Sequence, residues 1–312
     1  MNEPERSVMA DTLDVREVEL AAAGHEFRVR VYPAAVPDGT VLVWLHGGAF
    51  MFGDLDMPEA DETAKQLADR GTTVVSLDYT LAPTDAIAAL PPLEPVDGMP
   101  SPEALAASLG ADRVRSPYPV ASLQVVAAFD WAREHAAEYG GRADAVAVGG
   151  ASAGGNLAAG AALRLRDGAG PQPLAQVLVY PVLHAVLPEP DPELEAILAQ
   201  LPPGLRFPPE ATQAINANYL GGASFEERYA FPGGHDVRGV APSLVVTSEG
   251  DELRPSAEAY VGDLARGGVD VEYAKERGAI HGFLNLVGDP AAVRTVDRIS
   301  RFLNERASEV SA

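Results

Sequence analysis

Hydrophobic and polar positions follow two different periods along this chain. Near the N-terminus, residues 15–20 and 26–32 alternate apolar and polar side chains on either side of Ala23-Gly24. This alternation predicts an antiparallel hairpin. From Thr40 onward, short runs that are apolar throughout predict strands buried on both faces of a sheet. The expected buried strands are 40–45, 72–77, 145–148, 175–180, 243–247 and 269–273.

Helical patterns separate these apolar runs. The expected helices are 58–70, 120–139, one that begins directly after Gly154-Gly155, 255–266 and 290–305. Regular alternation of strand and helix, without an internal repeat, is typical of a doubly wound α/β fold. We therefore expect residues 1–312 to form a single α/β domain, with a mostly parallel sheet of about eight strands and an antiparallel N-terminal hairpin.

Two long segments interrupt the alternation. Residues 84–119 are rich in proline and alanine and predict only one short helix, at 102–109. Residues 184–239 also lack a strand pattern and predict helices at 192–200 and 210–220. Long segments of this kind inside a compact domain are typical of lids or insertions. We expect a cap built from residues 1–12, 84–119 and 184–239.

Composition and charge exclude several functional classes. The 312 residues carry 45 acidic and 23 basic side chains, a net charge of −22, which disfavours nucleic acids and anionic membranes as partners. The absence of cysteine excludes disulfides, thiolate catalysis and Cys-ligated metals. No apolar run approaches the ~18 residues of a membrane span, and the polar start of the chain lacks the pattern of a signal peptide. A cytoplasmic location is expected.

A single serine marks the junction between the strand at 145–148 and the helix that follows. Ser152 lies at the centre of a G-x-S-x-G pattern that runs from Gly150 to Gly154. The glycines allow a sharp turn in which larger side chains would collide with the strand and the helix. Such a turn exposes the serine hydroxyl above a helix N-terminus, where negative charge is favoured. The alternative is an ordinary glycine-rich turn, but the rest of the chain supplies the partners that a nucleophile needs.

Acyl transfer by a serine requires a base and an acid that orients the base. Of the six histidines, His281 follows the last predicted strand and precedes the final helix, at the sheet edge where ligands bind in open parallel sheets. Asp251 follows the strand at 243–247 and is the predicted acid, with Glu249 as its rival on the same loop.

The remaining requirement is a set of N–H donors for a developing oxyanion. The sequence His46-Gly47-Gly48-Ala49-Phe50 follows a predicted buried strand, and its glycines allow close approach of a substrate oxygen. We expect the N–H groups of Gly47, Gly48 and Ala153 to donate hydrogen bonds to the oxyanion. Candidate pocket walls are Phe50, Met51, Phe52, Tyr180 and His184. No metal-ligand pattern occurs, and neither a metal nor an organic cofactor is expected.

Six motifs together resemble the hormone-sensitive-lipase-like esterases of the α/β-hydrolase superfamily. They are 46–50 (HGGAF), 78–83 (DYTLAP), 150–156 (GASAGGN), 180–181 (YP), 251–254 (DELR) and 281–283 (HGF). The resemblance implies a serine carboxylesterase that forms an acyl-enzyme on a small-molecule ester with a short or medium acyl chain. It assigns Ser152 as nucleophile, His281 as base and Asp251 as its orienter, and it suggests a homodimer.

The chain departs from the family pattern at several positions. Ala49 stands where a third glycine is usual, and Ala151 and Thr84 stand where acids are common. Hydrolysis of amides or lactones would use the same residues and stays open. A non-catalytic ligand-binding protein would be expected to lack part of the triad, which is complete here. A lyase of this fold would favour a hydroxyl residue at position 49 or 151, where this chain has alanine.

Overall fold

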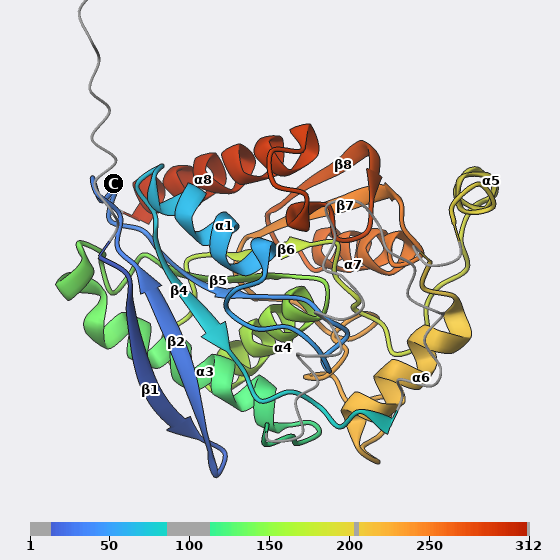
Figure 1. Cartoon of the computed structure of the whole chain (residues 1–312), viewed down its shortest axis with the longest axis horizontal. Helices are drawn as coiled ribbons and strands as arrows, with labels where there is room; N and C mark the ends of the chain where they lie inside the picture. Colours follow the sequence, from blue (N-terminus) through green and yellow to red (C-terminus); the bar gives the residue numbers. More distant parts are fainter. Residues whose placement is uncertain (1–13, 86–112, 203–205, 311–312) are drawn as a thin grey trace, which may run out of the picture.

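An eight-stranded sheet forms the centre of the molecule (Figure 1). The computed structural model describes residues 14–85, 113–202 and 206–310, and the strand order in this part is β1-β2-β4-β3-β5-β6-β7-β8. The strands are β1 (Arg16–Ala22), β2 (His25–Tyr32), β3 (Val41–Leu45), β4 (Thr73–Asp78), β5 (Val146–Ala151), β6 (Gln176–Val179), β7 (Ser243–Gly250) and β8 (Val271–Ile280). β2 pairs antiparallel with β1 and β4, and all other pairs are parallel. The predicted fold class is confirmed.

Helices cover both faces of the sheet (Figure 1). Helices α1 (Pro58–Ala68) and α8 (Pro290–Val310) pack on one face. Helices α3 (Val120–His135), α4 (Ala153–Asp167) and α7 (Arg254–Arg266) pack on the other. None of the helices in the described part of the chain combines the length and apolarity that crossing a membrane requires.

The central strand β3 shows why buried strands read as continuous apolar runs. Val43 and Leu45 join the core on the α3–α4 face, whereas Leu42 and Trp44 join the core on the α1–α8 face. Because successive side chains of a strand point to opposite faces, a strand covered by helices on both sides needs apolar residues at every position.

Strand β8 is longer than the sequence pattern predicts and begins two residues later. It spans Val271–Ile280 instead of 269–273, and many of its side chains are partly or fully exposed. The strand lies at the edge of the sheet with β7 as its partner. Charged residues such as Lys275 and Arg277 are tolerated there because an edge strand is only half covered, so the apolar pattern does not mark its end.

The two long insertions meet beside the sheet. The helices predicted within 184–239 are present as α5 (Pro192–Leu198) and α6 (Pro209–Leu220). The N–H of Tyr118 donates to the carbonyl of Tyr219 on α6 at 2.7 Å, and the Asn218 amide donates to the Pro83 carbonyl at 2.7 Å. Tyr118, near the end of the first insertion, and Pro83, directly before its start, therefore both bond to the second insertion. Residues 1–12 and the helix predicted at 102–109 lie outside the described residues.

Candidate active site

Ser152 occupies a strained turn between β5 and α4. Its φ of 55° and ψ of −118° lie outside the regions that L-residues prefer. The flanking glycines have no room for a side chain. A Cβ on Gly154 would lie 2.2 Å from the Leu45 carbonyl oxygen, and one on Gly150 would lie 2.5 Å from the backbone of Gly154. This crowding explains the G-x-S-x-G spacing physically.

The structure brings Ser152, His281 and Asp251 together. His281 Nε2 lies 2.9 Å from Ser152 Oγ, and His281 Nδ1 lies 2.8 Å from Asp251 Oδ2. Each residue directly follows a parallel strand: Ser152 follows β5, Asp251 follows β7 and His281 follows β8. The carboxyl ends of these strands meet at one edge of the sheet, which places three residues distant in sequence within hydrogen-bonding reach.

Asp251 is held in a fixed orientation. Its side chain is 1% exposed, and its second oxygen, Oδ1, accepts the N–H of Leu253 at 2.9 Å. The rival acid Glu249 points elsewhere, because its carboxylate accepts the N–H of Gly278 at 2.8 Å. Of the two acids on this loop, Asp251 is the one bonded to the histidine.

The environment of His281 favours its protonated form. Burial lowers the pKa of the imidazole, but the Asp251 carboxylate outweighs this effect through its charge and its hydrogen bond, so that the net pKa is raised above its usual value. The carboxylates of Glu59 and Glu252 act in the same direction. A histidine in this position is well suited to take up a proton from the serine hydroxyl.

Tyr79 holds the loop after β3 by a ring contact and a hydrogen bond. The Tyr79 ring stacks on His46 at 4.5 Å, and its hydroxyl donates to the carbonyl of His46 at 3.0 Å. Gly48 has a φ of +110°, and a Cβ there would lie 2.4 Å from the Phe52 carbonyl oxygen. Its own carbonyl accepts the N–H groups of Met51 and Phe52. We call residues 46–50 the oxyanion loop.

One predicted oxyanion donor needs correction. The N–H of Gly47 donates to Glu59 Oε1 at 2.5 Å and is therefore not available to a substrate. Among the described residues, the N–H groups of Gly48 and Ala49 donate to no protein atom. Ala49 has a φ of 52° and provides the third position of the loop, where the family pattern has glycine. The structure thus favours Gly48, Ala49 and Ala153, whose N–H lies at the free N-terminus of α4.

The predicted pocket residues differ in their contacts: some pack in the core, and one contacts the triad. Phe50, Met51 and Phe52 are at most 6% exposed, and Phe50 stacks on Tyr219 at 4.0 Å within the core. The Tyr180 ring lies 4.9 Å from the His281 ring. His184 Nδ1 bonds to Ser256 Oγ at 3.0 Å. Of this set, Tyr180 is the residue with a ring contact to the triad, and a pocket role for the others stays a prediction.

Three residues near the triad were not predicted. Phe207, in the second insertion, packs edge-on against His281 at 4.8 Å. Glu59 and Asn285 bond to each other beneath the oxyanion loop. An acid in the first turn of a helix is usually exposed, and an aromatic residue in a proline-rich insertion carries no periodicity, so the sequence held no signal for these positions.

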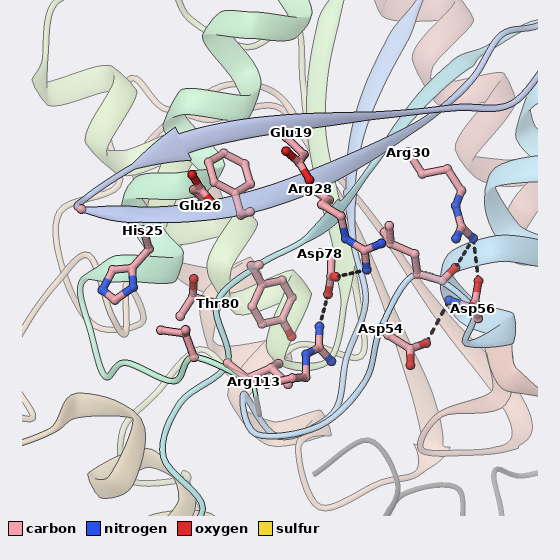
Figure 2. A pocket seen from close by; sticks show the side chains of 16 residues that line it. Glu19, His25, Glu26, Arg28, Arg30, Asp54, Asp56, Asp78, Thr80 and Arg113 are labelled. Atoms are coloured by element: carbon pink, nitrogen blue, oxygen red, sulfur yellow. Dashed lines mark hydrogen bonds and ion pairs between the residues drawn. The ribbon is translucent and has the colours of Figure 1, made fainter. Parts of the chain in front are cut away.

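A separate polar hollow of about 780 Å³ lies along the β1–β2 hairpin (Figure 2). Asp78 on its wall pairs with both Arg28 and Arg113, at 2.8 and 2.5 Å (Figure 2). Tyr79 also lines this hollow, but none of the three triad residues does. The hollow is therefore distinct from the site where acyl transfer would occur.

Comparison with known proteins agrees with this geometry. Residues 42–91 and 114–285 match a family model described as the alpha/beta hydrolase fold. The carboxylesterase NlhH of Mycobacterium tuberculosis is 31% identical over 86% of this chain and 75% of its own length. An ethyl acetate hydrolase of Pseudomonas putida is 27% identical over 84% of this chain and 73% of its own length.

Solved structures of esterases are also similar to this chain. A hyperthermophilic esterase from the archaeon Pyrobaculum calidifontis superimposes with a TM-score of 0.74 at 26% identity, over 94% of this chain and 83% of that one. The chain therefore belongs to the hormone-sensitive-lipase-like carboxylesterases of the α/β-hydrolase superfamily and is a hydrolase of the esterase type.

Proposed function

We propose that the protein hydrolyses carboxylic esters through an acyl-enzyme on Ser152. The observation that carries this proposal is the continuous hydrogen-bonded chain from Ser152 through His281 to Asp251. Ser152 Oγ attacks the ester carbonyl carbon while His281 Nε2 takes its proton, and the carbonyl oxygen becomes the oxyanion of a tetrahedral intermediate. His281 then passes the proton to the leaving alcohol as the C–O bond breaks.

Water completes the cycle. A water molecule gives its proton to His281 and attacks the acyl carbon, and the second tetrahedral intermediate releases the carboxylic acid and restores Ser152 Oγ–H. We assign the N–H groups of Gly48, Ala49 and Ala153 as the oxyanion donors. Each such donor contributes on the order of 100- to 1,000-fold to the rate in comparable enzymes.

We propose short- or medium-chain acyl esters as the substrate class. The relative from P. putida is an ethyl acetate hydrolase, which supports a short acyl group. Phe207 and Tyr180 contact His281 and would border the substrate. Amide and lactone hydrolysis would use the same residues and are the alternative.

A series of p-nitrophenyl esters from acetate to laurate tests this proposal. We expect kcat/KM to be highest for the short or medium chains and to fall for laurate, because the side chains around His281 limit the room for the acyl group. Stoichiometric labelling by a fluorophosphonate should stop hydrolysis, since only an activated serine is trapped. A folded protein that neither hydrolyses the esters nor takes up the label would contradict the proposal and favour a binding or lyase role.

The raised pKa of His281 predicts the pH dependence. His281 acts as a base only when neutral, so kcat/KM should fall on the acid side with a midpoint above about 6.5, the usual histidine value. The groups that face His281 are Asp251, Glu59, Glu252 and the phenol of Tyr180. A profile of kcat/KM from acid to alkaline pH measures the midpoint. An acid limb centred well below the usual value would show that these carboxylates do not control the base.

A homodimer and a cytoplasmic location stay predictions from the sequence. Sedimentation equilibrium of the purified protein tests the first, and fractionation of the native cells tests the second.

A further inference from the structure

Glu59 has an unusual environment for an acid at the start of a helix. It lies in the first turn of α1, yet it is only 2% exposed. Asp61 and Glu62, on the same helix, pair with Lys65 near the surface. A carboxylate taken out of water destabilises the fold unless hydrogen bonds compensate for the loss of solvent. Helix formation does not require a buried carboxylate at this position, so Glu59 must have another role.

Neutral donors provide this compensation. Glu59 Oε1 accepts the N–H of Gly47 at 2.5 Å, and Oε2 accepts the Tyr180 hydroxyl at 3.0 Å and the Asn285 amide at 3.2 Å. Within the described residues, no lysine or arginine bonds to this carboxylate. All three partners carry hydrogen-bond donors, so both oxygens of the carboxylate have acceptor roles here.

The contact with Gly47 holds the oxyanion loop in place. The peptide group between His46 and Gly47 is held at both ends: Tyr79 donates to its carbonyl, and its N–H donates to Glu59. A Cβ on Gly47 would lie 2.6 Å from Glu59 Oε1 and 3.0 Å from Ser152 Cβ. Gly47 is thus wedged between Glu59 and the nucleophile, while the next two N–H groups stay free.

The other two contacts of the Glu59 carboxylate, with Tyr180 and Asn285, connect it to His281 and its segment. The Tyr180 ring lies 4.9 Å from His281, and burial together with the Glu59 carboxylate raises the pKa of its phenol, which keeps the hydroxyl a donor. Asn285 follows His281 by four residues and returns to the same segment through the carbonyl of Gly282. One carboxylate therefore touches both the loop of the oxyanion donors and the segment that carries the histidine.

We propose that Glu59 is a positioning residue for ester hydrolysis, whose buried carboxylate holds the oxyanion loop in register with the segment of His281. The proposal rests on the catalytic roles assigned above. Glu59 does not touch the substrate; it acts by orienting the N–H groups of Gly48 and Ala49 and by placing a negative charge near His281.

The test compares Glu59→Gln and Glu59→Ala with Glu62→Gln, which makes the same change of charge on the solvent side of the same helix. In Glu59→Ala the oxyanion loop loses its anchor. We expect kcat for p-nitrophenyl acetate to fall about 10- to 100-fold with little change in KM, because the oxyanion contacts develop in the transition state. Glu59→Gln keeps an acceptor for Gly47 and should recover part of this loss.

The pH profile separates positioning from a merely structural role. Glu59→Gln removes a negative charge that favours protonated His281, while Asp251 and Glu252, which also face the imidazole, are unchanged. The acid limb of kcat/KM should therefore move to lower pH than in the wild-type protein. Glu62→Gln should leave both kcat and the acid limb in place.

Unchanged kcat and an unchanged acid limb in folded Glu59 variants would overturn the inference. If the Glu59 variants fail to fold, Tyr180→Phe provides a second test. It deletes only the hydroxyl bonded to Glu59 Oε2 and keeps the ring, and its kcat and KM are compared with those of the wild-type protein. A few-fold loss of kcat at constant KM supports the inference, and wild-type kinetics contradict it. An inactive wild-type protein would instead count against the proposed function.

Discussion

Ser152→Ala should abolish ester hydrolysis, with kcat lower by about 10⁴- to 10⁶-fold. The substitution removes the hydroxyl that we propose as the nucleophile, while the proposed oxyanion donors and the binding surface stay in place. The residual rate would reflect those groups alone. Release of p-nitrophenol from p-nitrophenyl acetate measures the loss, and fluorophosphonate labelling should disappear with it.

Ser243→Ala is a matched control for this experiment. Ser243 is also buried, but it begins β7 and so lies at the opposite end of the parallel strands, where its hydroxyl bonds to Gln176 and the Ala241 carbonyl. We expect a stability cost of about 1 kcal/mol from the lost hydrogen bonds and an unchanged kcat. Substantial hydrolysis by purified Ser152→Ala would show that another group is the nucleophile.

Asp251→Asn should lower kcat by about 10³- to 10⁴-fold. Asparagine has nearly the same shape, but its amide can present an NH₂ group to His281 Nδ1, which favours the wrong tautomer and leaves Nε2 unable to accept the serine proton. The substitution also removes the main charge that stabilises the imidazolium. Steady-state kinetics near neutral pH, with circular dichroism as a check on folding, measure the effect.

Glu249→Gln tests whether the correct acid has been assigned. It removes the same charge two residues earlier on the same segment, where the carboxylate bonds to the N–H of Gly278 instead of to His281. We expect kcat within a few-fold of the wild-type value. A severe loss in Glu249→Gln combined with near-normal activity in Asp251→Asn would reverse the assignment.

The strands and the turn that carries Ser152 could be predicted because their signals are local. A strand covered on both faces must be apolar throughout, as β3 is, and the turn at Ser152 has no room for side chains at Gly150 and Gly154. Both requirements restrict which residue types can occur at neighbouring positions, so they can be recognised in the sequence. The extent of β8 could not be predicted, because an edge strand with exposed, charged positions has no such requirement.

Which N–H groups of the oxyanion loop stay free of protein partners was decided by contacts between distant segments. The sequence led us to expect Gly47 and Gly48 as the donors of the oxyanion loop, but the N–H of Gly47 donates to Glu59, twelve residues later. The packing of Phe207 on His281 and the bonds from Glu59 to Tyr180 and Asn285 likewise join parts of the chain that share no pattern.

The sequence by itself therefore determined the order of strands and helices and singled out Ser152, since backbone periodicity and the sterics of the turn restrict the residues at these positions. It also placed His281 and two candidate acids, Asp251 and Glu249, after predicted strands. Only the tertiary structure decided which donors are free and which buried acid supports them. Hydrogen bonds between remote segments depend on how helix α1 and the loops after β3, β6 and β8 pack together, and no periodicity in the chain records that packing.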